Sequence, residues 1–286
     1  MSDAQGRYIE FCKSSFTDLD LNGLSILLDC ANGATYSVAP KVFSELGANV
    51  ETIGASPDGI NINQNCGSTS PNALKEAIIK GSYDIGIAFD GDGDRILIVN
   101  SDGDILDGDD ILYILSKEIP TNSGVVGTLM TNKALELYFQ NEGIEFSRAD
   151  VGDKYVLQRL IERSWFLGGE PSGHIICLDS APTGDAIVAA LKFLNATKDK
   201  GFSVEKSLEG FKKFPQTLIN LKVNNPNKII ISDKFWEKVT EIELQLGDDG
   251  RVLIRPSGTE PLIRIMVESK DSGISENLCN SLADLA

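Results

Sequence analysis

Short apolar runs alternate with helically spaced apolar residues through the first third of the chain. Runs of about four to eight apolar residues are typical of buried strands, whereas apolar residues three and four positions apart are typical of one face of a helix. The expected strands cover residues 24–29, 50–53 and 85–89, and the expected helices cover residues 37–46 and 71–79. This βαβαβ order predicts a parallel sheet covered by helices, with ligands bound beyond the carboxyl ends of its strands.

The alternation returns after residue 108 and changes after residue 213. The middle part has expected strands at 125–129, 145–149 and 165–168 and expected helices at 109–117, 133–141, 153–163 and 184–195. The last part has expected strands at 217–223, 251–254 and 262–267 and expected helices at 233–246 and 274–285. We therefore predict an α/β protein with two consecutive α/β domains, residues 1–107 and 108–213, and a small α+β domain, residues 214–286.

Composition and charge narrow the class of protein. Of the 286 residues 42% are hydrophobic and 24% are charged, which is ordinary globular usage and excludes a disordered chain. The net charge of −16 argues against nucleic-acid and membrane-surface partners. There is no long apolar stretch and no basic-apolar leader, and the five cysteines have no pairing pattern, so we expect a cytoplasmic protein with reduced thiols.

The most acidic segment follows the expected strand at 85–89. It contains three aspartates separated by glycines and then an arginine: Asp90, Asp92, Asp94 and Arg95. Carboxylates at this spacing can converge, and converging carboxylates require a hard cation such as Mg²⁺ or Ca²⁺. An EF-hand is excluded because its glycine and glutamate positions hold Arg95 and Ser101. We favour a metal site over a solvated acidic turn, with Arg95 balancing the charge and facing a phosphate.

A second segment, Gly168-Gly-Glu-Pro-Ser-Gly-His174, contains the only histidine of the chain. Glu170 and Ser172 offer acceptors and a donor that suit sugar hydroxyls. A dinucleotide-binding loop is not supported, because the residues after His174 are strand-like and not helical. His174 is either a structural residue of the loop or an acid, a base or a hydroxyl ligand.

A third segment, Arg255-Pro-Ser-Gly-Thr-Glu-Pro261, is followed by Arg264. Its hydroxyls, its glycine amide and two guanidinium groups predict phosphate binding by Arg255, Ser257, Gly258, Thr259 and Arg264. The alternative is an ordinary hairpin loop, and a nucleotide-binding P-loop is absent from the sequence.

Three weaker candidates remain. Lys154 either is simply exposed or reaches a substrate. Two acidic stretches, residues 102–104 and 107–110, are interpreted as turns, because Ile105 and Leu106 between them predict a short hairpin strand.

In this order, the three motifs resemble those of the α-D-phosphohexomutase superfamily over nearly the whole chain. Within it, six segments are most similar to the bacterial phosphoglucosamine mutases: residues 6–12 (GRYIEFC), 29–35 (DCANGAT), 89–95 (FDGDGDR), 151–156 (VGDKYV), 169–174 (GEPSGH) and 255–261 (RPSGTEP). The resemblance implies that the three expected domains are phosphohexomutase domains II, III and IV, which carry the metal, sugar and phosphate loops respectively.

The resemblance also implies an isomerase that interconverts glucosamine 6-phosphate and glucosamine 1-phosphate for UDP-N-acetylglucosamine synthesis. The family uses a phosphoserine and a bisphosphate intermediate, here glucosamine 1,6-bisphosphate. By resemblance, Mg²⁺ is held by Asp90, Asp92 and Asp94, catalysis involves Arg95, Lys154 and His174, and the substrate is held by Glu170, Ser172, Arg255, Ser257, Gly258, Thr259 and Arg264. A phosphomannomutase or phosphoglucomutase, or a non-catalytic phosphosugar-binding module, is the alternative.

One departure from the family stands out. The Ser-His-Asn-Pro string of the nucleophile loop does not occur in the 286 residues. We therefore expect that this chain lacks the family's first domain. We expect that domain to be the chain's partner in catalysis, and the chain to be inactive without it. Because loss of a domain uncovers apolar surface, we also expect a tendency to form homodimers.

Overall fold

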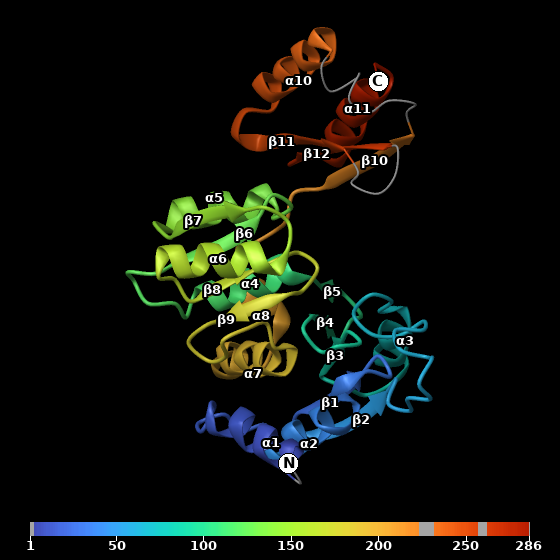
Figure 1. The fold of residues 1–286 in the computed structure, drawn as a ribbon, viewed down its shortest axis with the longest axis vertical. Coiled ribbons are helices and arrows are strands. Elements are labelled where there is room, and N and C mark those ends of the chain that lie inside the picture. The colour runs from blue at the N-terminus through green and yellow to red at the C-terminus, as the bar shows by residue number, and fades with distance from the viewer. Residues whose placement is uncertain (1–2, 223–231, 257–261, 286) are drawn as a thin grey trace. The chain divides into compact units, whose positions relative to one another are not determined.

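The computed structural model describes residues 3–222, 232–256 and 262–285 (Figure 1). The chain divides into two compact units, Met1–Thr131 with Tyr138–Phe211, and Asn132–Leu137 with Lys212–Ala286. Each unit is built of mixed helices and strands, as the apolar pattern predicts. None of the helices among the described residues has the length and apolar character needed to cross a lipid bilayer.

The first sheet of the larger unit has the strand order β2-β1-β3-β4-β5. Its strands are β1 (Ser25–Asp29), β2 (Asn49–Ile53), β3 (Ile85–Phe89), β4 (Ile96–Asn100) and β5 (Ile105–Leu106). The pairs β1–β2 and β1–β3 are parallel, as expected, whereas β3–β4 and β4–β5 are antiparallel. The apolar pattern did not lead us to expect β4. It is a hairpin partner of β3, so the segment between them is a hairpin connection at the carboxyl end of β3.

Four helical segments accompany this sheet: α1 (Ala4–Ser14), a 3-10 helix (Ala34–Ser37), α2 (Ala39–Glu45) and α3 (Asn72–Lys80). Leu74 and Ile78 are one turn apart on α3 and pack against Leu27 of β1 and Ala88 of β3. This spacing places both side chains on the same helix face, which explains why the helix covers the sheet. The apolar pattern does not predict α1, of which only Ile9 and Cys12 are buried.

The second sheet of the larger unit has the order β7-β6-β8-β9. Its strands are β6 (Gly124–Thr128), β7 (Glu145–Ala149), β8 (Leu167–Gly169) and β9 (Ile175–Cys177). The helices are α4 (Gly108–Ser116), α5 (Lys133–Glu142), α6 (Asp153–Arg163), α7 (Ala186–Thr197) and α8 (Val204–Leu208), with a 3-10 helix at Lys198–Lys200. Strands β6, β7 and β8 are parallel, and β9 is antiparallel to β8. This sheet therefore also ends in a hairpin, which contains the segment around Glu170.

The expected turn at residues 107–110 is wrong. Asp107 is the N-cap of α4: its Oδ1 accepts the backbone N–H groups of Asp109 and Asp110 at 3.0 and 3.4 Å. Asp110 Oδ2 in return accepts the N–H of Asp107 at 3.0 Å, which completes a capping box. The acidic residues stand here because the first turn of a helix has unpaired N–H groups and a positive dipole end.

The smaller unit has an antiparallel sheet in the order β10-β12-β11. Its elements are β10 (Gln216–Lys222), α10 (Asp233–Leu246), a 3-10 helix (Gly247–Asp249), β11 (Gly250–Pro256), β12 (Leu262–Ser269) and α11 (Ser272–Ala283). Both helices lie on one side of the sheet (Figure 1), around a core that includes Phe235, Ile242 and Ile265. The expected α+β architecture of this part of the chain is confirmed.

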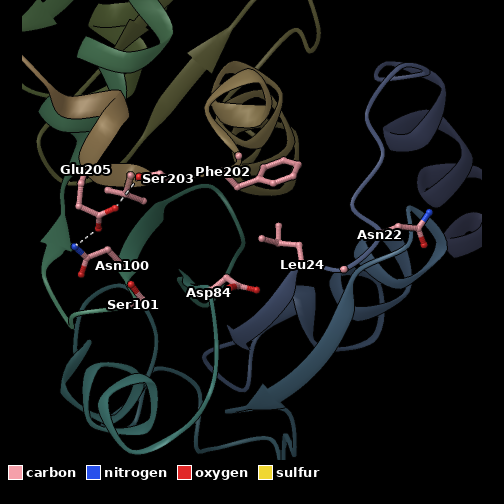
Figure 2. A pocket seen from close by; sticks show the side chains of 11 residues that line it. Asn22, Leu24, Asp84, Asn100, Ser101, Phe202, Ser203 and Glu205 are labelled. Carbon is pink, nitrogen blue, oxygen red and sulfur yellow. Dashed lines mark hydrogen bonds between the residues drawn. The ribbon is translucent and has the colours of Figure 1, made fainter.

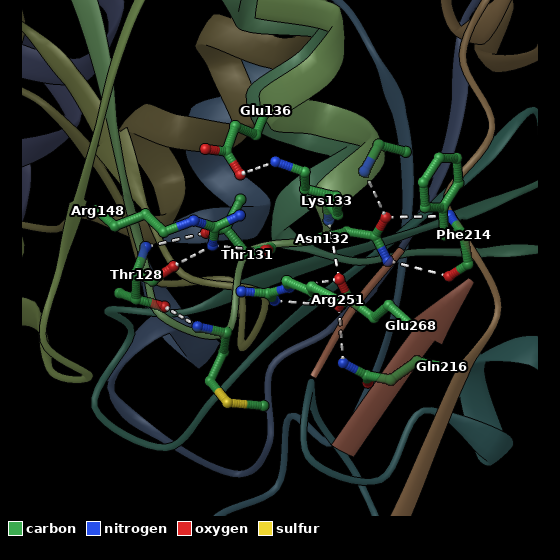
Figure 3. A network of polar contacts seen from close by, with 12 residues as sticks. Thr128, Thr131, Asn132, Lys133, Glu136, Arg148, Phe214, Gln216, Arg251 and Glu268 are labelled. Atoms are coloured by element: carbon green, nitrogen blue, oxygen red, sulfur yellow. Dashed lines mark hydrogen bonds and ion pairs between the residues drawn. The ribbon is translucent and has the colours of Figure 1, made fainter. Parts of the chain in front are cut away.

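This unit also contains residues 132–137, and a buried acidic residue holds the first turn of α5 within it (Figure 3). Glu268 on β12 is fully buried, and its carboxylate accepts the backbone N–H of Lys133 at 3.0 Å. Arg251 Nε lies 2.6 Å from the same carboxylate, and Gln216 donates to it at 3.1 Å. The buried carboxylate therefore accepts hydrogen bonds from several donors, one of them a cation, which is the condition under which a charged group is tolerated in a core.

Candidate cation and sugar-phosphate site

The acidic loop between β3 and β4 is folded around Asp90, which is 1% exposed. Asp90 Oδ1 accepts the backbone N–H groups of Gly93, Asp94 and Arg95 at 3.2, 3.1 and 3.0 Å. Gly93 has φ +79°, a conformation that glycine adopts without strain and other residues rarely adopt. The alternation of aspartate and glycine thus lets the backbone turn tightly over a buried carboxylate.

The loop brings the three aspartates together. One carboxylate oxygen from each of Asp90, Asp92 and Asp94 lies within 4.8 Å of the other two. Asp90 Oδ2 and Asp94 Oδ1 are buried and accept no hydrogen bond from any described residue. Arg95 Nε lies 2.9 Å from Asp90 Oδ2 and 3.5 Å from Asp94 Oδ1, so one positive charge faces two of the three carboxylates. Three oxygen donors with unbalanced negative charge fit Mg²⁺, whose remaining ligands are usually water or phosphate.

The loop between β8 and β9 lies against the acidic loop. Arg95 and His174 form an antiparallel backbone bridge, and the N–H of Ile96 donates to the carbonyl of Gly173 at 3.0 Å. The His174 side chain is 8% exposed, and its Nδ1 lies 3.2 Å from Asp94 Oδ2. His174 Nε2 has no hydrogen-bond partner among the described residues. The histidine is therefore a structural part of the loop and a neighbour of the aspartates, and its role as an acid, a base or a hydroxyl ligand stays a prediction.

A cavity of about 460 Å³ lies beside the two loops. Of the expected site residues, it is lined by Asp94, Arg95, Glu170, Ser172 and His174. Glu170 Oε2 accepts the N–H of Gly152 at 3.0 Å, which draws the segment before α6 into the cavity wall. Lys154 does not line this cavity: it is exposed on α6, with its ammonium group 4.6 Å from the ring centre of Tyr155.

A second cavity, of about 300 Å³, also reaches the aspartates. It is lined by Asp92 and Asp94 together with Tyr8, Thr35 and Asp185. The sequence motifs did not point to Tyr8 or Asp185 as site residues, because they lie 177 positions apart and neither belongs to the three loops. The signals present were local ones: the similarity of residues 6–12 to a family segment, and the start of the expected helix at 184–195.

A third cavity, of about 390 Å³, lies at the other end of the same strands (Figure 2). Leu24 and Asp84, which line it, directly precede β1 and β3, whereas Asp90 follows β3. Three of its polar side chains are paired with each other: Glu205 accepts hydrogen bonds from Asn100 at 2.8 Å and from Ser203 at 2.9 Å. This cavity therefore does not contribute to the acidic site.

In the smaller unit, two arginines of the third motif stand opposite each other. Arg255 on β11 pairs in register with Arg264 on β12. Arg264 Nε is buried and has no hydrogen-bond partner among the described residues. Like charges opposite each other on neighbouring strands repel, so this pair favours an anion that accepts from both. Ser257, Gly258 and Thr259 lie outside the described residues.

Comparison with known families accounts for nearly all of the chain. The models of Phosphoglucomutase/phosphomannomutase match in three consecutive parts: alpha/beta/alpha domain II at residues 6–103, alpha/beta/alpha domain III at residues 107–214 and the C-terminal domain at residues 218–285.

Several curated relatives are similar over almost the full chain. The phosphoglucosamine mutase of Legionella pneumophila is 50% identical over 289 residues, which cover 99% of this chain and 64% of the relative. The phosphoglucosamine mutase of Psychrobacter cryohalolentis is 51% identical over 99% of this chain and 63% of the relative. The chain thus spans somewhat less than two thirds of the length of these relatives.

Solved structures share the fold. A phosphoglucomutase/phosphomannomutase family protein of Burkholderia thailandensis matches with a TM-score of 0.81 and 23% identity, covering 99% of this chain and 64% of that protein. The Aspergillus fumigatus N-acetylphosphoglucosamine mutase, crystallised with GlcNAc-6P and magnesium, matches with a TM-score of 0.77 and 19% identity, covering 98% of this chain and 70% of that protein. With three family models in order along its length, the chain belongs to the phosphoglucomutase/phosphomannomutase family.

Proposed function

We propose that this chain supplies the cation-, sugar- and phosphate-binding parts of a phosphoglucosamine mutase, which interconverts glucosamine 6-phosphate and glucosamine 1-phosphate. The observation that carries the proposal is the convergence of three aspartate oxygens beside a cavity that is lined by Asp94 and Arg95 together with Glu170 and Ser172. The choice of an amino sugar rests on the identity of about half of all residues to phosphoglucosamine mutases. The domain boundaries near residues 107 and 213 belong to the same proposal.

Phosphoryl transfer depends mainly on positioning and on neutralising the charge of the moving group. Bound by Asp90, Asp92 and Asp94, Mg²⁺ would supply the divalent positive charge for this purpose. The Nε atom of Arg95 faces Asp90 and Asp94, which leaves the two terminal NH₂ groups of its guanidinium to grip a phosphate. The side chain is 40% exposed, so a phosphate in the cavity can reach it.

The loop between β8 and β9 is proposed to bind the sugar hydroxyls. Glu170 uses Oε2 to hold Gly152, which leaves Oε1 to accept from a hydroxyl, and the exposed Ser172 can both donate and accept. His174, held beside Asp94, is proposed to line the site, and Lys154, exposed on α6 outside the cavity wall, is proposed to reach the bound substrate. In the smaller unit, Arg255 and Arg264 are proposed to hold the phosphate that does not react, together with Ser257, Gly258 and Thr259.

The family's phosphoserine has no counterpart string in these 286 residues. We therefore propose that turnover, through glucosamine 1,6-bisphosphate, requires a phosphoserine-bearing segment in addition to this chain. The chain alone is expected to bind glucosamine 6-phosphate in the presence of Mg²⁺ without converting it.

The test joins the 286 residues to the part of the Legionella pneumophila relative that they do not match. We expect the joined protein, with Mg²⁺, to favour glucosamine phosphate over glucose and mannose phosphates by about 10-fold or more in kcat/KM. A reversed preference would make the protein a phosphoglucomutase or phosphomannomutase, for which the family description provides the support. Calorimetry on the unjoined chain completes the test. If this chain binds glucosamine 6-phosphate but the joined protein does not convert it, the chain is a non-catalytic module. If the chain does not bind it and the joined protein does not convert it, the proposal is refuted.

A further inference from the structure

A phenol and a carboxylate join the first helix to the start of α7. Tyr8 Oη lies 2.8 Å from both carboxylate oxygens of Asp185. Burial and the charge of Asp185 raise the pKa of the Tyr8 phenol well above its ordinary value. The phenol therefore stays protonated and remains a donor to Asp185 throughout the physiological range.

The same carboxylate sets the start of α7. Asp185 Oδ1 also accepts the N–H of Val188 at 3.0 Å, so it is the N-cap of this helix. A carboxylate with a donor on the helix side and a donor on the α1 side has little freedom to rotate. The position of the first turn of α7 thus depends on Tyr8.

Ala186 contacts the acidic loop directly, and Gly184 contacts it through His174 of the β8–β9 loop. The N–H of Ala186 donates to the carbonyl of Gly93 at 3.0 Å. Gly184 packs on the ring of His174: a Cβ at this position would lie 2.1 Å from His174 Nε2, so only glycine fits. His174 in turn lies beside Asp94. One end of one helix therefore supports the loop at two points.

The hydrogen bond from Ala186 matters most for Asp92. Asp92 is the exposed member of the triplet, and its own side chain is not held by burial. Its two neighbouring carbonyls are held instead: Gly91 O accepts from the N–H of Ala34 at 2.8 Å, and Gly93 O accepts from Ala186. The backbone on both sides of Asp92 is thus fixed by groups outside the loop.

We infer that Tyr8 and Asp185 are positioning residues for the cation: through the first turn of α7 they hold the acidic loop so that Asp92 and Asp94 converge with Asp90. The inference rests on the proposed cation site. Neither residue is assigned a contact with substrate or cation, so removal of the phenol hydroxyl should change the order of the loop and leave the donor set intact.

The decisive variant is Tyr8→Phe in the full chain, which removes one hydroxyl and changes no charge. The matched control is Tyr83→Phe, because Tyr83 makes the same kind of bond, to Glu51 at 2.5 Å, in the same unit but outside both cavities. Without any metal, we expect hydrogen exchange at the N–H groups of Ala186 and of residues 93–95 to become about 5-fold faster in Tyr8→Phe alone. By calorimetry, we expect its Mg²⁺ affinity to fall by about 10-fold, with no change in the control.

The two measurements separate the inference from the proposed function. If exchange is faster in Tyr8→Phe and the unmodified chain binds no Mg²⁺, the positioning of the loop by Tyr8 is supported and the proposed cation site is refuted. Unchanged exchange in Tyr8→Phe would overturn the inference, whatever the metal does. Faster exchange with unchanged Mg²⁺ affinity would overturn it as well, because the loop would then not need Tyr8 to bind the cation.

Discussion

Two acidic segments of the larger unit look alike in sequence and differ in structure. Residues 90–94 and 107–110 each combine aspartates with glycine directly after a strand. In the second segment, Asp107 and Asp110 exchange hydrogen bonds with the backbone at the start of α4. In the first segment, Asp90 Oδ2 and Asp94 Oδ1 accept no hydrogen bond from a described residue.

The difference lies in where the backbone donors are. A helix begins at Gly108, and the unpaired N–H groups of its first turn take up the carboxylate of Asp107. A hairpin connects β3 to β4, and the three N–H groups that face inward all go to one oxygen, Asp90 Oδ1. Among the described residues, Arg95 is the ion-pair partner of Asp90 Oδ2 and Asp94 Oδ1, and His174 lies beside Asp94 Oδ2. Carboxylate spacing alone therefore does not identify a cation site, since the element that follows decides what the carboxylates bind.

The largest expected effect tests the cation itself. Asp92→Asn changes the exposed member of the proposed cation site, so it removes a donor charge and disturbs no buried contact. We expect Mg²⁺ affinity to fall by about 100-fold or more, because loss of even an outer-shell partner costs about 10–100-fold. Isothermal titration of the chain with Mg²⁺ measures the change. Asp109→Asn, at a buried aspartate of the helix start, is the comparison variant, and equal losses of Mg²⁺ affinity in the two variants would remove the distinction between the segments.

The next effect tests the helix cap. Asp107→Ala removes an acceptor for two backbone N–H groups, and we expect the free energy of unfolding to fall by about 1 kcal/mol, the usual cost of a lost N-cap. Urea unfolding followed by circular dichroism measures it, and Mg²⁺ affinity should not change. The contradicting result would be that Mg²⁺ raises the free energy of unfolding of the unmodified chain but not that of Asp107→Ala. Residues 107–110 would then bind the ion.

The regular elements of the fold were predictable where the apolar pattern is local. Strand β3 and helices α6 and α10 begin and end at the expected residues. Strand β4 was missed although its residues are apolar, because a βαβ pattern has no place for an antiparallel neighbour. Helix α1 was missed because its buried face consists of only Ile9 and Cys12, too little to give a clear period.

In the candidate site too, contacts between residues close in sequence could be predicted, and contacts between distant residues could not. Asp90, Asp92 and Asp94 stand within five positions, so one loop can bring them together and their spacing reveals it. The contact between Tyr8 and Asp185 spans 177 positions and depends on packing between two helices, which no local pattern encodes. The pairing of Arg255 with Arg264 required the register of β11 on β12, and the motif alone could not supply it.

The smallest expected effect uses a third acidic stretch, at residues 102–104. Asp102 is exposed in the turn between β4 and β5, and its segment has the same Asp-Gly-Asp letters as the cation loop. Because its carboxylate is solvated, we expect Asp102→Asn to change the free energy of unfolding by less than about 0.5 kcal/mol. Its Mg²⁺ affinity should also match that of the unmodified chain, measured in the same titration. A loss as large as that of Asp92→Asn would mean that the overall negative charge of the chain, rather than the hairpin geometry at Asp90, attracts the ion.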